Sequence, residues 1–246
     1  AHYLSEEATA LYEAARARIA RFIGAAQEEV IFTAGATASL NTVAYAWGGA
    51  NLGAGDNVVV SEMEHHSNLV PWQMIARRQG PELRMLPIDE QGRLMTERLP
   101  DLLDGRTKVV AVTQASNTLG TRPDLRPVAE AAHAVGAVVV VDGCQGIVHG
   151  GADMRTLGCD FYAFSGHKLY GPTGIGVLWG RRELLEAMPP FLCGGDMVDR
   201  VSFDETTFAP VPLKFEAGTA NFVGAVGLGA AVRFLEGLPL AEVEAY

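Results

Sequence analysis

Apolar residues along the chain form short continuous runs that alternate with stretches of helical spacing. The short runs predict strands at 30–33, 57–61, 83–86, 108–113, 138–141, 161–164 and 176–178. Helical spacing predicts helices at 5–22, around 40–47, and at 69–78, 95–103, 125–135 and 223–235. Ser5 is the expected N-cap of the first helix, and Gly24 is expected to end it.

Alternation of strands with helices predicts an α/β fold with a largely parallel sheet that helices cover on both faces. After residue 189 the pattern changes to loops rich in Gly and Pro, which are candidate contacts with another subunit. Ligands of such sheets bind outside the carboxyl ends of the strands. Polar residues follow the predicted strand ends at that edge: Thr37, His65, Asn117, Asp142, Gln145 and Lys168.

Composition narrows the function classes. The 246 residues carry a formal charge of −10 and no run of basic residues, which argues against a nucleic-acid surface. The longest apolar stretch, 134–141, is too short to span a bilayer. Three unevenly spaced cysteines do not form a disulfide framework. These features predict an acidic cytoplasmic enzyme that binds neither nucleic acid nor membrane.

Lys168 is the strongest candidate for covalent chemistry. The chain has only three lysines against sixteen arginines, and Lys168 follows Ser165-Gly166-His167 and precedes a turn rich in Gly and Pro. Asp142 follows four consecutive valines at the end of another strand. Pyridoxal phosphate needs a lysine for its Schiff base and an acid that keeps its pyridine nitrogen protonated. The alternatives are a surface lysine in a turn and an ordinary Asx turn at a strand end.

A phosphate group could bind beside this pair. The turn Gly35-Ala36-Thr37 leads into a predicted helix, whose N-terminal N–H groups and dipole favour an anion. Ser165 and His167 flank the lysine and could close around the same phosphate. Thr37 could also be a simple N-cap, and the two roles are compatible.

His65 and His66 are a less specific signal. Adjacent residues of an extended segment point to opposite sides, so the pair is unsuited to binding one metal ion, and no metal site is predicted. We expect one of them to stack on the cofactor ring. Gln145 could donate a hydrogen bond to the phenolic oxygen of the cofactor. The glycines of 171–176 precede a strand, which excludes a dinucleotide fingerprint.

Several long strings of the sequence resemble the class V aminotransferase family of pyridoxal enzymes. Within that family, the chain is similar to the group II cysteine desulfurases, which include selenocysteine lyases. The resemblance runs through almost the whole chain. It rests on the strings at 61–73, 112–121, 141–145, 161–180, 194–197 and 215–221.

The resemblance implies the large domain of a fold type I pyridoxal phosphate enzyme, with a role for each candidate residue. Lys168 would form the Schiff base, Asp142 would pair with the pyridine nitrogen, and His65 would stack on the ring. Gln145 would bind the ring oxygen, and Asn117 would lie beside the substrate and that oxygen. The implied phosphate contacts come from Thr37, Ser165 and His167, and from Thr219 of a second subunit in a homodimer.

The implied reaction converts L-cysteine, or L-selenocysteine, to L-alanine. Sulfur passes to an enzyme cysteine as a persulfide, and then to an acceptor protein for iron–sulfur clusters or other sulfur compounds. Two alternatives remain open. One is another class V activity, such as a lyase, an aminotransferase or an epimerase, and the other is a truncated cofactor-binding module without activity.

Some positions depart from the family pattern. Ala36 and Ala38 stand near positions that commonly hold Thr and Glu, and Cys144 and Cys193 replace small residues. The family's persulfide cysteine and substrate-binding arginine lie in a C-terminal small domain. We therefore expect residues 1–246 to be the large cofactor-binding domain, without an N-terminal segment and that small domain, and unable to complete desulfuration alone. Cys144 could substitute as the nucleophile, but we expect it to act as a small apolar residue that lies beneath the ring, opposite His65.

Overall fold

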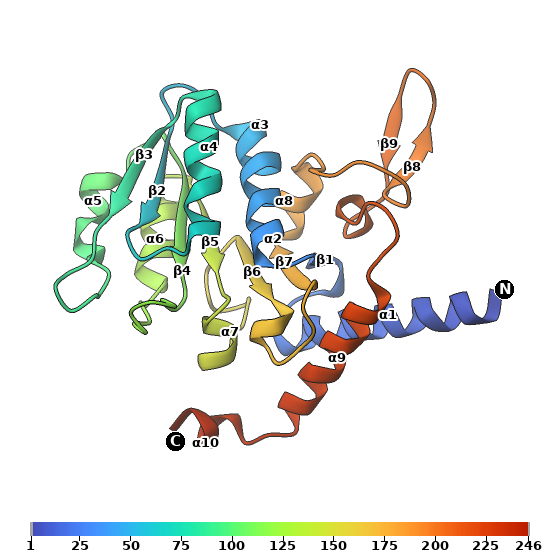
Figure 1. Cartoon of the computed structure of the whole chain (residues 1–246). Helices are drawn as coiled ribbons and strands as arrows, with labels where there is room; N and C mark the ends of the chain where they lie inside the picture. The colour runs from blue at the N-terminus through green and yellow to red at the C-terminus, as the bar shows by residue number, and fades with distance from the viewer. Residues whose placement is uncertain (1, 246) are drawn as a thin grey trace.

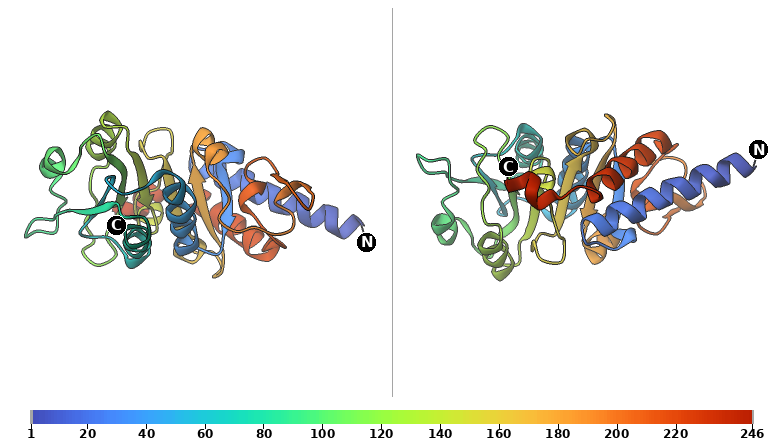
Figure 2. Two further views of the ribbon diagram at one scale, coloured as in Figure 1. Left: turned by 90° about the horizontal axis from the view of Figure 1, so that it is seen from above. Right: turned by 90° about the horizontal axis from the view of Figure 1, so that it is seen from below.

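In the computed structural model, which describes residues 2–245, seven strands form one sheet between helices on both faces (Figures 1 and 2). The order across the sheet is β1 (Val30–Thr33), β7 (Gly176–Gly180), β6 (Phe161–Ser165), β5 (Val138–Asp142), β4 (Thr107–Thr113), β2 (Asn57–Ser61) and β3 (Glu82–Leu86). Only β7 runs against its neighbours. The connection from β6 to β7 is too short for the crossover that a parallel pair needs. The predicted, mostly parallel α/β sheet is confirmed.

The helices match the predicted pattern with two corrections. Helix α1 begins at His2, so the prediction of Ser5 as its N-cap is wrong, because a cap residue has a non-helical backbone. The helix predicted at 95–103 is a 3₁₀ turn followed by α5, which begins immediately before Pro100. The described helices are α1 (His2–Phe22), α2 (Ala36–Thr42), α3 (Gly49–Asn51), α4 (Val70–Gln79), α5 (Leu99–Leu102), α6 (Arg126–Ala134), α7 (Gly146–His149), α8 (Arg182–Ala187), α9 (Phe222–Glu236) and α10 (Leu240–Ala245).

Turns complete the framework around these elements. A π-helical turn, Val43–Gly48, joins α2 to α3 into one continuous helix. Short 3₁₀ turns lie at Gln27–Glu29, His66–Asn68, Thr96–Arg98, Gly166–Lys168 and Leu213–Phe215. Gly24 has a φ of +66°, the left-handed conformation that favours glycine after a helix, and α1 ends two residues before it as expected.

The four consecutive valines before Asp142 place apolar side chains on both faces of the sheet, because helices cover both faces. In β5, Val139 and Val141 point into the core beneath α1, α6 and α9, whereas Val140 points into the core beneath α2 and α4. Strands buried on both faces have continuous apolar sequences for this reason. Within residues 2–245, no helix combines the length and apolarity that crossing a membrane requires.

A small hairpin, β8 (Val198–Val201) and β9 (Thr206–Phe208), stands away from the main body where the sequence predicted only loops (Figure 1). Its apolar side chains are exposed, with Phe203 at 105% of the reference area and Val201 at 63%. Hydrophobic periodicity detects strands through burial on one face. Against the rest of residues 2–245 the hairpin has no such buried face, so its strands carry no periodic signal.

Helix α1 is fixed to the sheet and to the segment before α9 by a buried ion pair. Arg16 is fully buried, and its Nη1 and Nη2 donate to Oε1 and Oε2 of Glu216 at 2.6 and 2.9 Å. Glu216 also accepts from the backbone N–H of Phe32 in β1 at 2.7 Å and from the hydroxyl of Tyr12 at 2.9 Å. One carboxylate therefore joins α1, β1 and the 213–221 segment.

Replacing Glu216 with glutamine is expected to lower the free energy of unfolding by about 2–3 kcal/mol, because the buried guanidinium loses charge-assisted hydrogen bonds. Urea unfolding would measure the change. Glu13 is the matched control, because it pairs with the same arginine at 3.0 Å but has a 39% exposed side chain. Glu13→Gln should cost less than about 1 kcal/mol. Equal losses in the two variants would contradict the prediction.

Candidate functional site

A cavity of about 300 Å³ lies at the carboxyl ends of the parallel strands and brings the predicted residues together. β1, β2, β4, β5 and β6 all end at this edge of the sheet, as expected for a parallel α/β fold. The predicted residues that line the cavity are Thr37, His65, Asn117, Asp142, Gln145, Ser165, His167 and Lys168. Thr219 lies elsewhere, in a separate hollow with Tyr12 and Phe32.

Asp142 and Lys168 face the same cavity from neighbouring strands. Asp142 is only 4% exposed, and its Oδ1 accepts a hydrogen bond from the backbone N–H of Cys144 at 3.0 Å. Burial raises the pKa of Asp142, against the opposing effects of that hydrogen bond and of the nearby His65 and Lys168. Lys168 ends the 3₁₀ turn after β6, and its side chain is exposed. A buried acid and an accessible amine therefore line the same cavity.

His65 is held in one orientation by the turn that follows it. Its Nδ1 accepts a hydrogen bond from the backbone N–H of Ser67 at 3.1 Å, so a neutral ring carries its proton on Nε2. The hydroxyl of Ser67 lies 3.0 Å from the same nitrogen and 2.7 Å from Oγ1 of Thr37. Sequence reasoning missed Ser67. The available signal was a serine two residues after a histidine at a strand end, where a local turn is common.

The end of β6 and the start of α2 meet beside Lys168. Oγ of Ser165 accepts a hydrogen bond from the backbone N–H of Ala36 at 2.9 Å. Gly35 has a φ of +150°, and a Cβ added there would lie 3.3 Å from the same hydroxyl oxygen. His167 is exposed next to them. Hydroxyl groups, a histidine and a helix start thus converge on one part of the cavity, an arrangement suited to an anion.

Cys144 lies in the cavity wall and is a poor nucleophile. Its Sγ is 3.9 Å from Oγ of Ser165. Burial, reinforced by the negative charge of Asp142, raises the pKa of the Cys144 thiol to about 12. The group is therefore a thiol at neutral pH, which favours the interpretation as a small, weakly polar wall residue over that of a substitute nucleophile.

Alkylation should distinguish the cysteines. At pH 7.5, iodoacetamide is expected to modify the exposed Cys193 about tenfold faster or more than Cys144 in the cofactor-free protein, because the thiolate is the reacting form. Cys159 is buried and should also react slowly. Peptide mass spectrometry over time would measure the rates, with the unfolded protein as a control in which all three react alike. Rapid labelling of Cys144 would return it to the list of candidate nucleophiles.

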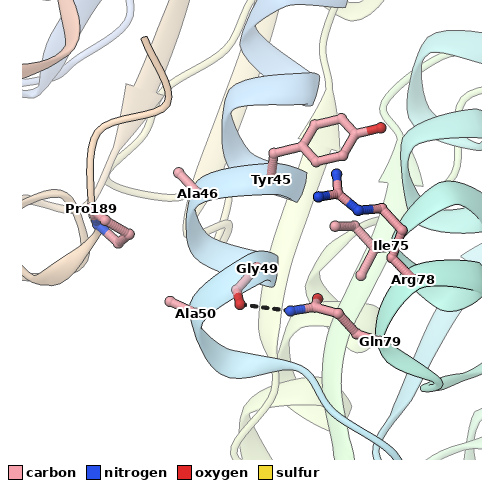
Figure 3. A pocket seen from close by; sticks show the side chains of 8 residues that line it. All are labelled: Tyr45, Ala46, Gly49, Ala50, Ile75, Arg78, Gln79 and Pro189. Atoms are coloured by element: carbon pink, nitrogen blue, oxygen red, sulfur yellow. Dashed lines mark hydrogen bonds between the residues drawn. The ribbon is translucent and has the colours of Figure 1, made fainter. Parts of the chain in front are cut away.

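Two other hollows lack a lysine that could form a Schiff base. One hollow, of about 450 Å³, lies between the α2–α3 helix, α4 and Pro189 (Figure 3). Its wall offers Tyr45, Arg78 and Gln79, without an acid, a lysine or a nucleophile. A groove of about 1210 Å³ borders the site, and Asn117 and Gln145 line both the groove and the cavity. Among residues 2–245, no group of three or more His, Cys, Asp and Glu side chains could hold a metal ion.

The residues of the cavity fit the requirements of pyridoxal phosphate. An exposed lysine can form a Schiff base, and a buried acid that accepts one hydrogen bond can pair with a protonated ring nitrogen. Hydroxyl groups at a helix start can bind phosphate. The buried position of Asp142 is the decisive observation, because a buried carboxylate with one backbone hydrogen bond is stabilised further by a cationic partner such as a protonated ring nitrogen.

Comparisons with known proteins place the chain among related sequences and structures. A cysteine desulfurase from Klebsiella pneumoniae is 52% identical over 247 residues, which cover 100% of this chain and 61% of the relative. The crystal structure of the cysteine desulfurase CsdA from Escherichia coli aligns with a TM-score of 0.95 at 46% identity, and covers 100% of this chain and 62% of that one. An apo cysteine desulfurase from Thermococcus onnurineus also aligns with a TM-score of 0.95, at 39% identity and with 61% of its chain covered.

The chain thus spans about three-fifths of the length of these relatives. The family model described as aminotransferase class-V matches residues 1–246, the whole of the sequence. Together with the relatives, this match shows that the chain belongs to the class-V aminotransferase family.

Proposed function

We propose that residues 1–246 are the large, cofactor-binding domain of a pyridoxal phosphate-dependent cysteine desulfurase. The observation that carries the proposal is the cavity that both Lys168 and the buried Asp142 line, in a chain about half identical to cysteine desulfurases. Another class V activity, such as selenocysteine lyase, is the second candidate. The same residues would support it, because they act on the cofactor and not on the substrate's sulfur.

Each residue has a proposed part. Lys168 binds the cofactor covalently, Asp142 holds the proton of the ring nitrogen, and His65 stacks on the ring. Gln145 and Asn117 contact the ring oxygen, and Asn117 also lies beside the substrate. Phosphate binding is assigned to Thr37, Ser165 and His167 of this chain and to Thr219 of a second subunit.

Chemistry at the substrate then depends on proton transfer. When bound, pyridoxal phosphate supplies an electron sink that stabilises negative charge at the substrate Cα. The amine of Lys168, when it is not bound to the cofactor, would remove the Cα proton of L-cysteine as a general base. Asp142 would hold the proton of the ring nitrogen and so favour this proton transfer. The thiol that takes the sulfur is proposed to lie in the part of the relatives that this chain does not span.

A homodimer is part of the proposal. Thr219 is exposed and lines a hollow separate from the cavity. Its proposed contact with the phosphate would therefore be made in the cavity of a second subunit. Exposed apolar residues on the β8–β9 hairpin, including Val201 and Phe203, would be covered by a second subunit. A monomeric protein with full cofactor affinity would contradict this part of the proposal.

The cellular role follows from the proposed reaction. All three cysteines of the chain are free, as is typical of a reducing compartment such as the cytoplasm. A persulfide made there would serve iron–sulfur cluster assembly or another sulfur pathway through an acceptor protein.

Product analysis of the full-length natural protein tests the proposed function. With added pyridoxal phosphate and a reductant, we expect equal amounts of alanine and sulfide from L-cysteine. A protein that forms neither product, but transfers the amino group of another amino acid to a keto acid, would be an aminotransferase. Faster alanine release from L-selenocysteine would indicate the lyase.

A further inference from the structure

We propose that Glu64 is a positioning residue of the site, which fixes the turn carrying His65 and Ser67 to the ends of strands β2 and β4. The inference deepens the proposed function, because the fixed turn holds the ring that would stack on the cofactor. Glu64 itself does not line the cavity, so its action would be through His65.

The carboxylate of Glu64 connects the end of β2, the end of β4 and the 3₁₀ turn that follows His65. Its Oε1 accepts from the backbone N–H of Thr113, the last residue of β4, at 2.6 Å. The same oxygen accepts from the hydroxyl of Ser61, the last residue of β2. Its Oε2 accepts from Nδ2 of Asn68 at 2.6 Å. Both oxygens are therefore used, and each fixes a different side of the turn.

Asn68 transmits this constraint to His65. Asn68 is fully buried, and its Oδ1 accepts from Nε1 of Trp72 at 3.3 Å, which determines the orientation of its amide. Its backbone N–H donates to the carbonyl oxygen of His65 at 2.8 Å and closes the turn. Within the closed turn, the backbone N–H of Ser67 reaches Nδ1 of His65. These hydrogen bonds, joined by the backbone of residues 65–68, thus connect the Glu64 carboxylate to the imidazole.

The electrostatics agree with a site that depends on these donors. Burial, with a smaller contribution from the charge of Asp142, raises the pKa of Glu64, whereas the hydrogen bonds from Ser61, Asn68 and the N–H of Thr113 favour its ionised form. An acid in such surroundings is unfavourable without its hydrogen bonds. Glutamine is nearly isosteric but has a single acceptor oxygen, so it cannot accept from both Thr113 and Asn68. Rotating the Asn68 amide would only transfer the mismatch to Trp72.

Two variants test the proposal, with one matched control. Glu64→Gln removes one acceptor oxygen and Glu64→Ala removes both. Glu62→Gln, the control, changes an exposed acid of the same segment that accepts from the N–H of Ile88. The first readout is the ¹⁵N NMR spectrum of the His65 ring in the cofactor-free protein, assigned with His65→Gln. The second is the affinity for pyridoxal phosphate, measured by titration of its visible absorbance.

The native protein and Glu62→Gln should show one neutral tautomer of His65, with the proton on Nε2. Both Glu64 variants should show a mixture of tautomers and a dissociation constant for pyridoxal phosphate raised about 10- to 100-fold, the scale known for loss of supporting contacts. A folded Glu64→Gln protein with the native tautomer and affinity would overturn the proposal. So would a Glu64→Gln protein that fails to fold, because the residue would then serve folding itself.

The two readouts separate this inference from the proposed function. The tautomer of His65 is measured without cofactor, so it tests the positioning role even in a protein that does not bind pyridoxal phosphate. A native protein with a single tautomer and no cofactor binding would refute the proposed function alone.

Discussion

Replacing Lys168 with alanine is expected to abolish covalent attachment of pyridoxal phosphate and to reduce turnover of L-cysteine by at least about 10³-fold. The reason is that one amine is assigned both the Schiff base and the transfer of the Cα proton, and general acid–base catalysis alone contributes about 10²–10⁴-fold. Borohydride reduction of the native holoenzyme, followed by peptide mass spectrometry, should locate the cofactor on Lys168. The variant should yield no labelled peptide.

Lys214 provides the control for this experiment. It is one of only three lysines, and its Nζ donates to the carbonyl oxygens of Leu185 and Glu186, outside the cavity. Lys214→Ala should retain the labelled Lys168 peptide and most of the turnover. Labelling at Lys214 or Lys108 in the native protein would refute the assignment of Lys168.

Asp142→Asn is expected to raise the dissociation constant for pyridoxal phosphate by about 30- to 4,000-fold. This range corresponds to the roughly 2–5 kcal/mol lost when one partner of a buried charge pair is removed. Asparagine can still accept from the N–H of Cys144, which limits the structural change. Absorbance titration and equilibrium dialysis would measure the affinity. An unchanged dissociation constant would show that Asp142 does not pair with the ring nitrogen.

The same variant should have the opposite effect on the cofactor-free protein. The pKa of Asp142 is raised by burial above its ordinary value of 3.8, so the folded state binds more protons than the unfolded state between the two values. The contribution of protonated Asp142 to the free energy of unfolding is fully present below the ordinary pKa and is lost as the pH rises through the raised pKa of the folded state. The asparagine side chain does not ionise and so avoids that loss, and Asp142→Asn should melt at or above the native temperature at pH 7. A lower melting temperature would indicate that the carboxylate stabilises the fold.

Much of the fold was accessible from the sequence because burial leaves a periodic pattern. The strands at 30–33 and 57–61 were predicted at their observed bounds, since their apolar residues are buried between helices. Three features were not accessible. The direction of β7 depends on a short connection, the hairpin at 198–208 has no buried face, and the extension of α1 before Ser5 lacks a capping signal.

The candidate site was predictable to the extent that it lies at strand ends. Asp142 and Lys168 follow strands that end at one edge of a parallel sheet, so their convergence follows from topology. Ser67 and Glu64 were missed. Their importance depends on hydrogen bonds to Thr37 and Thr113, which lie about 30 and 50 positions away in the chain. Sequence spacing does not reveal such contacts.

By itself, the sequence determined the α/β class, the edge of the sheet that carries the chemistry and the lysine and acid suited to pyridoxal phosphate. These follow from local apolar periodicity and from the rare placement of reactive side chains after strands. Only the tertiary structure decided that Asp142 is buried with a raised pKa, that the Cys144 thiol is protonated and that Glu64 fixes the His65 turn. Desolvation and hydrogen-bond geometry determine these properties, and both depend on atoms that the fold brings together from distant positions in the chain.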